Sequence, residues 1–204
     1  MRLFVAIVPP PAALAELSDQ VAPLRLAWPG LRWTSQQSWH VTLAFLGETR
    51  DDVLPELGVR LERAARRHHA LPIAVRDGGA FPRPRRATVV WAGLEADQPA
   101  LAALAASVAA GARRAGAPAP DEGRRYRPHL TLAWLREPAD MSPLVADLAG
   151  LAGRRWTASQ ISLVCSHLPD GPGRPPRYEE LASWPLGAAD PAGAPAAETA
   201  GPGG

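Results

Sequence analysis

The chain has 204 residues, of which 47% are hydrophobic, and its formal net charge is +2 at pH 7. This composition is typical of a folded domain and excludes an intrinsically disordered protein. All 22 basic residues are arginines. Because the net charge is small, only the positions of these arginines can indicate nucleic-acid binding.

The first part of the chain predicts alternating strands and helices. β-Branched residues predict a strand over 3–8, and a helix follows over 10–26, with proline tolerated in its first turn. A short strand is expected over 31–34 and a strong one over 40–46, ended by a glycine. Apolar residues at helical spacing predict an amphipathic helix over 51–69.

The rest of the chain repeats this outline. The expected elements are strands over 73–75 and 87–92, a helix over 99–115, a loop over 116–123, a strand over 129–134, a helix over 142–149, and strands over 159–167 and 177–184 joined by a turn over 169–176. This rough duplication predicts an α+β fold of two related lobes. We expect residues 1–186 to form one bilobal domain. Residues 187–204, rich in Pro, Gly and Ala, carry too little apolar surface to fold, so we expect a disordered tail.

The cysteine content and the lengths of the apolar runs indicate the cellular compartment of the protein. The single cysteine, Cys165, lies in an apolar run, so we expect a buried, unreactive thiol and a reducing compartment. The apolar N-terminal run is short and ends at three prolines, which is typical of a strand rather than a signal peptide. Since no run is long enough to span a bilayer, we expect a cytoplasmic protein without membrane contact.

Two segments share the pattern His-x-Thr-Leu-Ala, one at His40 and Thr42 and the other at His129 and Thr131. Side chains two residues apart in a strand point to the same face, so each histidine shares a face with its threonine. If the lobes are related by a pseudo-two-fold axis, the two His/Thr pairs meet across one cleft. A single strand histidine is more often structural, but two copies in the same context favour a functional interpretation.

Paired histidines and threonines suit the cleavage of a phosphodiester. In-line displacement needs a base that activates water and an acid that protonates the leaving oxygen on the opposite side. Because the ordinary pKa of histidine is about 6.5, one histidine can be neutral while the other is protonated near neutral pH. Threonine hydroxyls can donate hydrogen bonds to the nonbridging phosphate oxygens. We therefore expect a catalytic site made of His40, Thr42, His129 and Thr131, with no metal and no cofactor.

These motifs and their surroundings resemble a known enzyme family. Residues 2–7, 79–82 and 89–93, together with both motifs, are similar to the RNA 2′,3′-cyclic phosphodiesterases of the two-histidine (2H) phosphoesterase superfamily, also described as 2′-5′ RNA ligases. The resemblance implies a bilobal fold in which two mainly antiparallel sheets flank a central cleft, with helices packed outside. It also implies hydrolysis of the cyclic phosphate to a 2′-phosphate, with His40 as the proton donor to O3′ and His129 as the proton acceptor from water. The residues alone do not distinguish these two roles.

Basic and aromatic residues near the motifs are candidates for substrate binding. They are Phe81, Arg83, Arg85 and Arg86 in a proline-stiffened loop, and Tyr126 and Arg127 before the second motif. We expect the arginines to contact RNA phosphates and the aromatic rings, Trp39 included, to stack on bases. The alternative is a solvated arginine loop in a chain that is rich in arginine.

One position departs from the pattern of the family. Relatives commonly carry a phosphate-binding arginine three residues after the second threonine, where this chain has Trp134. In a regular strand Trp134 and Arg136 would point away from His129, and a bulge after Leu132 would be needed to bring either toward the site. We therefore expect Arg127 or one of the loop arginines, in preference to Arg136, to bind the phosphate.

The expected partner is RNA with 2′,3′-cyclic phosphate ends, tRNA fragments among them, and the expected state is a monomer. The alternatives are a 2H hydrolase of another cyclic or 2′-5′ phosphodiester small molecule, and a non-catalytic module that binds RNA ends. His68 and His69 end a helix, where histidine suits the helix dipole, and no further ligand at metal-site spacing accompanies them. The arginines of the helices over 51–69 and 99–115 are expected to form solvated faces.

Overall fold

The computed structural model describes residues 1–119, 126–167 and 176–187. Residues 120–123 of the expected loop, residues 169–175 of the expected turn and residues 188–204 of the expected tail lie outside the described residues. Gly187, the first residue of that tail, is described. Its amide donates to the carbonyl oxygen of His68 (2.8 Å), just past the end of helix α2 (Leu54–Arg66).

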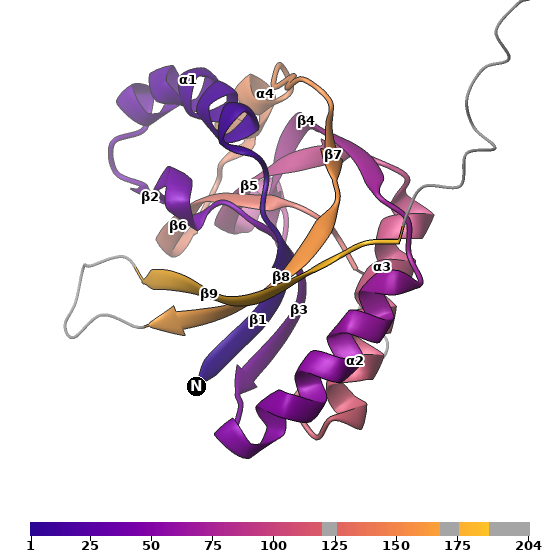
Figure 1. Ribbon diagram of the computed structural model, residues 1–204. Helices are drawn as coiled ribbons and strands as arrows, with labels where there is room; N and C mark the ends of the chain where they lie inside the picture. Colours follow the sequence, from indigo (N-terminus) through magenta and orange to yellow (C-terminus); the bar gives the residue numbers. More distant parts are fainter. Residues whose placement is uncertain (120–125, 168–175, 188–204) are drawn as a thin grey trace, which may run out of the picture.

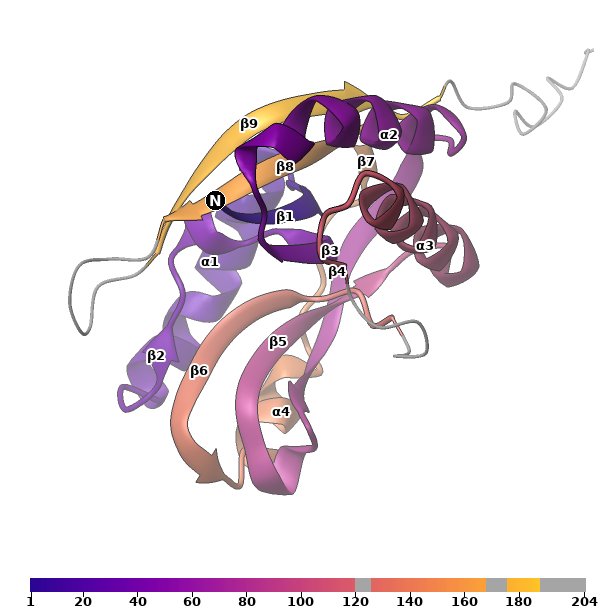
Figure 2. The same ribbon diagram turned by 90° about the horizontal axis from the view of Figure 1, so that it is seen from below.

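Within these residues the strands form two antiparallel sheets (Figures 1 and 2). The first sheet has the order β3-β1-β8-β9 and the second the order β2-β6-β5-β4-β7. The strands span Arg2–Ile7 (β1), Arg32–Trp33 (β2), Val41–Glu48 (β3), Leu71–Phe81 (β4), Ala87–Glu95 (β5), Leu130–Ala139 (β6), Trp156–Ala158 (β7), Gln160–His167 (β8) and Arg177–Pro185 (β9). The predicted α+β class with two mainly antiparallel sheets is confirmed.

Each sheet combines strands from distant parts of the chain. The C-terminal strands β8 and β9 return to pair beside β1, and the short β2 pairs with β6. The two lobes therefore do not correspond to consecutive halves of the sequence. This interleaving ties both ends of the chain to the same sheet, so neither lobe can form from one half of the chain alone.

The described helices divide between the two sheets. Helix α2 packs against α3 (Gln98–Arg114), and the pair contacts the first sheet at β9 and β3. Helix α4 (Ser142–Leu148) packs against β4 of the second sheet. Helix α1 (Pro11–Ala27) lies at the opposite end of the molecule from α2 and α3, where Gln20 exchanges two hydrogen bonds with the backbone of Ala152 (Figure 1).

Strand β4 is much longer than the predicted strand 73–75. Its second half contains Gly78 and Gly79, which have low strand propensity and hide the strand from pattern analysis. Both glycines are required by close packing. A Cβ atom on Gly78 would lie 2.8 Å from the Leu148 side chain, and one on Gly79 would lie 2.3 Å from the Trp91 ring. Strand β7 was not predicted at all, because its three residues are too few to show a period.

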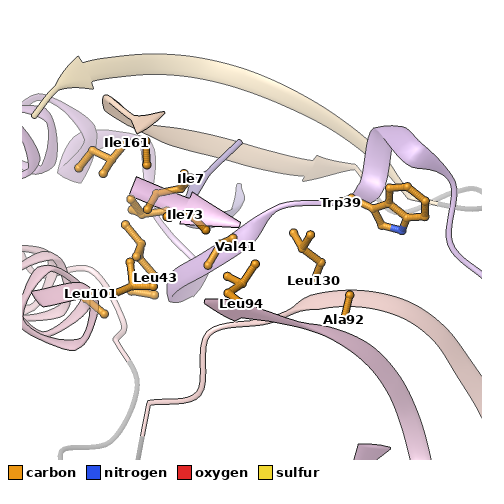
Figure 3. Close-up of a cluster of buried hydrophobic side chains, with 14 of the residues drawn as sticks. Ile7, Trp39, Val41, Leu43, Ile73, Ala92, Leu94, Leu101, Leu130 and Ile161 are labelled. Atoms are coloured by element: carbon orange, nitrogen blue, oxygen red, sulfur yellow. The ribbon is translucent and has the colours of Figure 1, made fainter. Parts of the chain in front are cut away.

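One continuous apolar core joins the two sheets (Figure 3). Ile7 and Val41 from the first sheet lie in the same buried cluster as Ile73, Leu94 and Leu130 from the second. The two lobes are therefore packed directly against each other where these buried side chains meet. Because packed interiors hold their side chains in fixed positions, this core fixes the relative position of the strands that carry the two motifs.

Candidate active site

Both motif histidines lie one residue before the strand that carries their threonine. His40 precedes β3, which contains Thr42, and His129 precedes β6, which contains Thr131. Thr42 lies opposite a residue of the neighbouring β1, and Thr131 lies opposite a residue of the neighbouring β5. The two motifs thus occupy equivalent places in the two sheets. We call the sheet faces that carry these four side chains the motif faces.

A β-bulge follows each threonine at the same position. The pairing of β3 with β1 skips Leu43, and the pairing of β6 with β5 skips Leu132. An extra residue reverses the alternation of side chains along a strand, so the residue three places after each threonine returns to the motif face. The duplication expected from the sequence therefore extends to the register of the strands.

His40 lies in an aromatic environment on the first sheet. The Phe4 ring stacks on it with the centroids 4.5 Å apart, and Tyr178 meets it edge-on at 5.2 Å. The sequence reasoning missed both neighbours. The apolar residues on both faces of the strand 2–7 could have indicated Phe4, because a strand that is apolar on both faces has to be covered on both. Nothing near Tyr178 in the sequence links it to His40.

Burial of the imidazole lowers the pKa of His40 to about 4, and the charge of His129 contributes to the decrease. Two conclusions follow. The histidines, which come from different sheets, lie close enough to interact electrostatically. The His40 ring is also neutral near neutral pH, since its pKa lies well below 7.

His129 contacts aromatic residues of the second sheet. Its ring meets the Phe81 ring edge-on at 4.9 Å and lies 6.2 Å from the ring of Trp91. Its Nδ1 lies 2.7 Å from the carbonyl oxygen of Arg127. A carbonyl oxygen only accepts hydrogen bonds, so Nδ1 carries the hydrogen and proton exchange with a substrate falls to Nε2.

Two hydrogen-bonded bridges connect the motifs. The Tyr126 hydroxyl donates to the backbone carbonyl of Thr42 (3.1 Å). In the other direction, the Trp39 indole N–H donates to the hydroxyl of Thr34 (2.8 Å), which itself lies 2.7 Å from the carbonyl oxygen of Thr131. Each bridge joins the segment before one histidine to the strand of the other motif. The relative position of the two motifs is therefore fixed by polar contacts as well as by the core.

The two motif threonines have no side-chain hydrogen bond to any residue that the structure describes. Both Thr42 and Thr131 are partly exposed on the motif faces. Their hydroxyls can therefore donate to a bound anion without first giving up a bond within the protein.

The predicted substrate-binding residues differ in what they contact and in how exposed their side chains are. Phe81 contacts His129 and ends β4, and the arginines that follow it, Arg83, Arg85 and Arg86, are exposed on the adjoining turn. Arg127 is exposed, and its carbonyl oxygen accepts from His129. Tyr126 is half-buried, and burial raises the pKa of its hydroxyl. The suggestion that Trp39 stacks on a base is wrong, because its side chain is buried.

A basic cavity lies elsewhere in the molecule. It has a volume of about 320 Å³ and lies between α2 and α3, where Arg60, Arg63, Arg67 and Arg114 line it. Arg63, Arg67 and Arg114 are exposed, as expected for solvated faces, and neither motif histidine lines the cavity. Nearby, His68 forms a hydrogen bond with Ser107 (2.8 Å). The pKa of His68 is lowered, mainly by burial and to a smaller extent by the charges of His69 and Arg67.

The described part of the chain shows neither a metal-binding cluster nor a membrane-spanning helix. No group of three or more His, Cys, Asp or Glu side chains lies together in the manner of metal ligands there. None of the helices in those ranges is long and apolar enough for a membrane crossing. Cys165 is buried, as predicted.

Known proteins share this sequence pattern. The sequence model of the family described as LigT like Phosphoesterase matches residues 7–91 and 93–173. A Thermus thermophilus protein named RNA 2′,3′-cyclic phosphodiesterase is 33% identical over 180 residues, which cover 84% of this chain and 85% of that protein. An Aeropyrum pernix protein of the same name is 32% identical over 132 residues, which cover 65% of this chain and 71% of that protein.

Solved structures share the fold. The crystal structure of a Thermus thermophilus protein has a TM-score of 0.71 at 29% identity, covering 93% of this chain and 100% of that one. E. coli LigT in its apo form has a TM-score of 0.68 at 25% identity, covering 91% and 97%. E. coli LigT complexed with 3′-AMP has a TM-score of 0.67 at 26% identity, with the same coverage. On this sequence match and this fold, the chain belongs to the LigT-like phosphoesterase family.

Proposed function

We propose that this chain hydrolyses the 2′,3′-cyclic phosphate ends of RNA to 2′-phosphates, using His40 and His129 as its acid and base and no metal ion. The observation that carries the proposal is the equivalent placement of two His/Thr pairs, whose histidines interact electrostatically. The relatives named RNA 2′,3′-cyclic phosphodiesterase support the substrate class, and the E. coli LigT complex with 3′-AMP supports a nucleotide at the site.

In the proposed reaction a water molecule attacks the phosphorus of the cyclic phosphate. Nε2 of His129 takes one proton from this water as the new P–O bond forms, since Nδ1 is committed to the Arg127 carbonyl. The bond from phosphorus to O3′ breaks, and His40 supplies the proton that O3′ needs to leave as a hydroxyl. The product carries its phosphate on O2′. At the end of a turnover His129 has gained a proton from water and His40 has given one to O3′, so the two histidines have exchanged protonation states.

The low pKa of His40 constrains this assignment. With a pKa of about 4, the ring carries no proton near neutral pH, whereas an acid must hold one. A bound phosphate places a negative charge beside the ring, and an opposite charge within several ångströms raises the pKa of a histidine. The proposal therefore requires His40 to take up its proton as the substrate binds.

The threonines and the neighbouring arginines supply the remaining contacts. The hydroxyls of Thr42 and Thr131 donate to the nonbridging oxygens, whose negative charge grows as the pentavalent transition state forms. Arg127 and the arginines at positions 83, 85 and 86 hold the RNA chain near His129, and Phe81 and Tyr126 line the same region. We further propose that the protein acts as a monomer in the cytoplasm and that tRNA fragments are among its substrates.

The test is turnover of a short RNA that ends in a 2′,3′-cyclic phosphate, with phosphorus NMR to identify the product. The proposal expects a 2′-phosphate product, retained activity in excess chelator, and slower turnover of a cyclic mononucleotide. Faster turnover of the mononucleotide would favour a small-molecule phosphodiesterase. Binding of the RNA end without turnover would favour a non-catalytic module. Loss of activity with chelator, restored by a divalent ion, would contradict the metal-free mechanism.

A further inference from the structure

The bulge at Leu132 turns Trp134 onto the motif face of the second sheet. Across the ladder, Trp134 pairs with Val89 and Thr131 pairs with Trp91. Val89 and Trp91 are two residues apart in β5, so their side chains point to the same face. Residues directly opposite each other in a sheet also share a face. Trp134 therefore lies on the same face as Thr131, although a regular strand would place it on the other side.

Trp134 exposes half of its surface, whereas Leu132 and Ala133 beside it are buried. Removing the apolar surface of an indole from water is favourable, so an indole that stays exposed forgoes this stabilisation. Exposed aromatic surface next to polar functional groups is typical of a surface that contacts a ligand. A flat ring on a motif face suits a nucleobase, because stacking on an aromatic side chain tolerates any base.

Arg32 accompanies Trp134 on this face. It is the cross-strand partner of Trp134 in the pairing of β2 with β6, and its side chain is exposed. The adjacent Trp33 points the other way, toward the core: its indole N–H donates to the Trp28 carbonyl oxygen (3.0 Å), and the Arg25 guanidinium lies 5.8 Å from the centre of its ring. Arg32 forms no ion pair with any residue that the structure describes. Its guanidinium is therefore available to an anion beside the indole.

The position of Trp134 along β6 sets its distance from Thr131. Trp134 lies three residues beyond Thr131, and the bulge shortens that separation to roughly 7–10 Å at about 3.3 Å for each strand residue. That spacing leaves room for one nucleotide between the two positions, so Trp134 and Arg32 can hold the part of the substrate that precedes the cyclic phosphate.

We propose that Trp134 and Arg32 form a subsite for the nucleotide that precedes the cyclic-phosphate end. Its base stacks on the Trp134 indole, and the phosphate that links it to the terminal nucleotide binds the Arg32 guanidinium. This inference rests on the proposed function, because it names the part of an RNA substrate that the site recognises. It also specifies the substrate: a dinucleotide end is preferred over a cyclic mononucleotide.

The first sheet provides a matched control at Phe45. The bulge at Leu43 brings Phe45 onto the other motif face in the same way, and 64% of its surface is exposed. Its cross-strand partner is the buried Phe4 and not a cation. Both lobes thus display an aromatic residue after the bulge, but in the described residues only Trp134 has an arginine as its cross-strand partner.

The experiment measures kcat/KM for a cyclic mononucleotide and for a dinucleotide with a cyclic end, and compares their ratio among variants. In the natural protein the dinucleotide should be favoured by about tenfold or more, which is the scale of one base stacked on an aromatic side chain. Trp134→Ala and Arg32→Ala should each reduce this ratio severalfold. Trp134→Phe should restore most of it, and Phe45→Ala should leave it unchanged.

The subsite is contradicted if the natural protein does not prefer the dinucleotide, or if Trp134→Ala and Arg32→Ala keep the ratio. It is equally contradicted if Phe45→Ala reduces the ratio as much as Trp134→Ala does. If neither substrate turns over, the proposed function has failed and the subsite is tested by calorimetry with the dinucleotide and mononucleotide 3′-phosphates. The same variants should then lose the affinity advantage of the dinucleotide, and an unchanged advantage would overturn the subsite.

Discussion

The hydroxyl of Tyr126 donates a hydrogen bond to the backbone carbonyl of Thr42, across the boundary between the two sheets. Tyr126 comes just before the second motif, and Thr42 belongs to the first. The tyrosine therefore acts as a brace between the two halves of the site. Loss of this hydrogen bond should change the stability of the protein and the position of Thr42, whereas loss of a substrate contact would change substrate binding.

Tyr126→Phe should destabilise the protein without removing a substrate contact. The variant loses one partly buried hydrogen bond, worth about 0.5–1.5 kcal/mol, which lowers Tm by a few degrees in a protein of this size. We expect kcat to fall severalfold with little change in KM, because the threonine shifts while binding surfaces remain. Thermal unfolding and steady-state kinetics measure both. An unchanged Tm together with a raised KM would instead identify Tyr126 as a substrate contact.

His40 should make the protein less stable in acid. Its pKa is lowered from 6.5 in the unfolded chain to about 4 in the folded protein, so between these values the unfolded chain binds the extra proton. Stability is therefore lost as pH falls from 6.5 toward 4, by up to about 1.4 kcal/mol for each pH unit. His40→Gln removes this contribution. Denaturant unfolding at about pH 7 and about pH 5 should show a smaller loss for the variant, and equal losses would mean that His40 is not buried as described.

Gly79→Ala should disturb the second histidine from a distance. The new Cβ would lie 2.3 Å from the Trp91 ring, so the ring has to move, and that ring lies 6.2 Å from His129. Overpacking of this kind typically costs about 1–3 kcal/mol, and we expect turnover to fall along with stability. Gly30→Ala is the control, because nothing lies within 4 Å of its added Cβ. Similar kinetics for the two variants would show that the Trp91 ring does not support His129.

One arginine near His129 should contribute most to phosphate binding. Single substitutions to alanine at Arg127, Arg83, Arg85 and Arg86 would be compared by KM and by the dependence of KM on salt. We expect Arg127→Ala to have the largest effect, since its exposed side chain starts only two residues before His129, whereas its backbone carbonyl, which holds the His129 ring, is kept in the variant. Arg85 also faces competition from Asp140, whose pKa is held low by hydrogen bonds from Ser142 and by the charge of Arg85. If all four variants behave like the natural protein, the anchoring role of these arginines is wrong.

The strands that carry the motifs could be predicted because their sequences alternate strongly. Val41 and Leu43 are buried while Thr42 is partly exposed, and this alternation also placed each histidine with its threonine. The bulges could not be predicted with the same ease. Their only signal is that two adjacent apolar residues, Leu132 and Ala133 in the second motif, interrupt the alternation after the threonine. That interruption reverses the face of Trp134, so the condition stated from the sequence for Trp134 to turn toward the site, a bulge at this point of the strand, is met.

The rest of the site depends on contacts between distant segments. Tyr178 reaches His40 from the C-terminal strand, and Arg32 lies beside Trp134 only because β2 pairs with β6. Neither pairing leaves a local pattern, since both depend on how the chain returns to a sheet that it has already left. The low pKa of His40 has the same origin, because burial is a property of the whole fold.

The central claim is that two histidines carry the reaction, and substitution of each is its most direct test. The measurement is kcat/KM on an RNA with a 2′,3′-cyclic end for the natural protein, His40→Ala and His129→Ala, with circular dichroism to verify folding. Each variant should remain folded and lose about 10²–10⁴ in rate, the usual contribution of a general acid or base. A folded variant of either kind that keeps most of its activity would contradict the two-histidine mechanism.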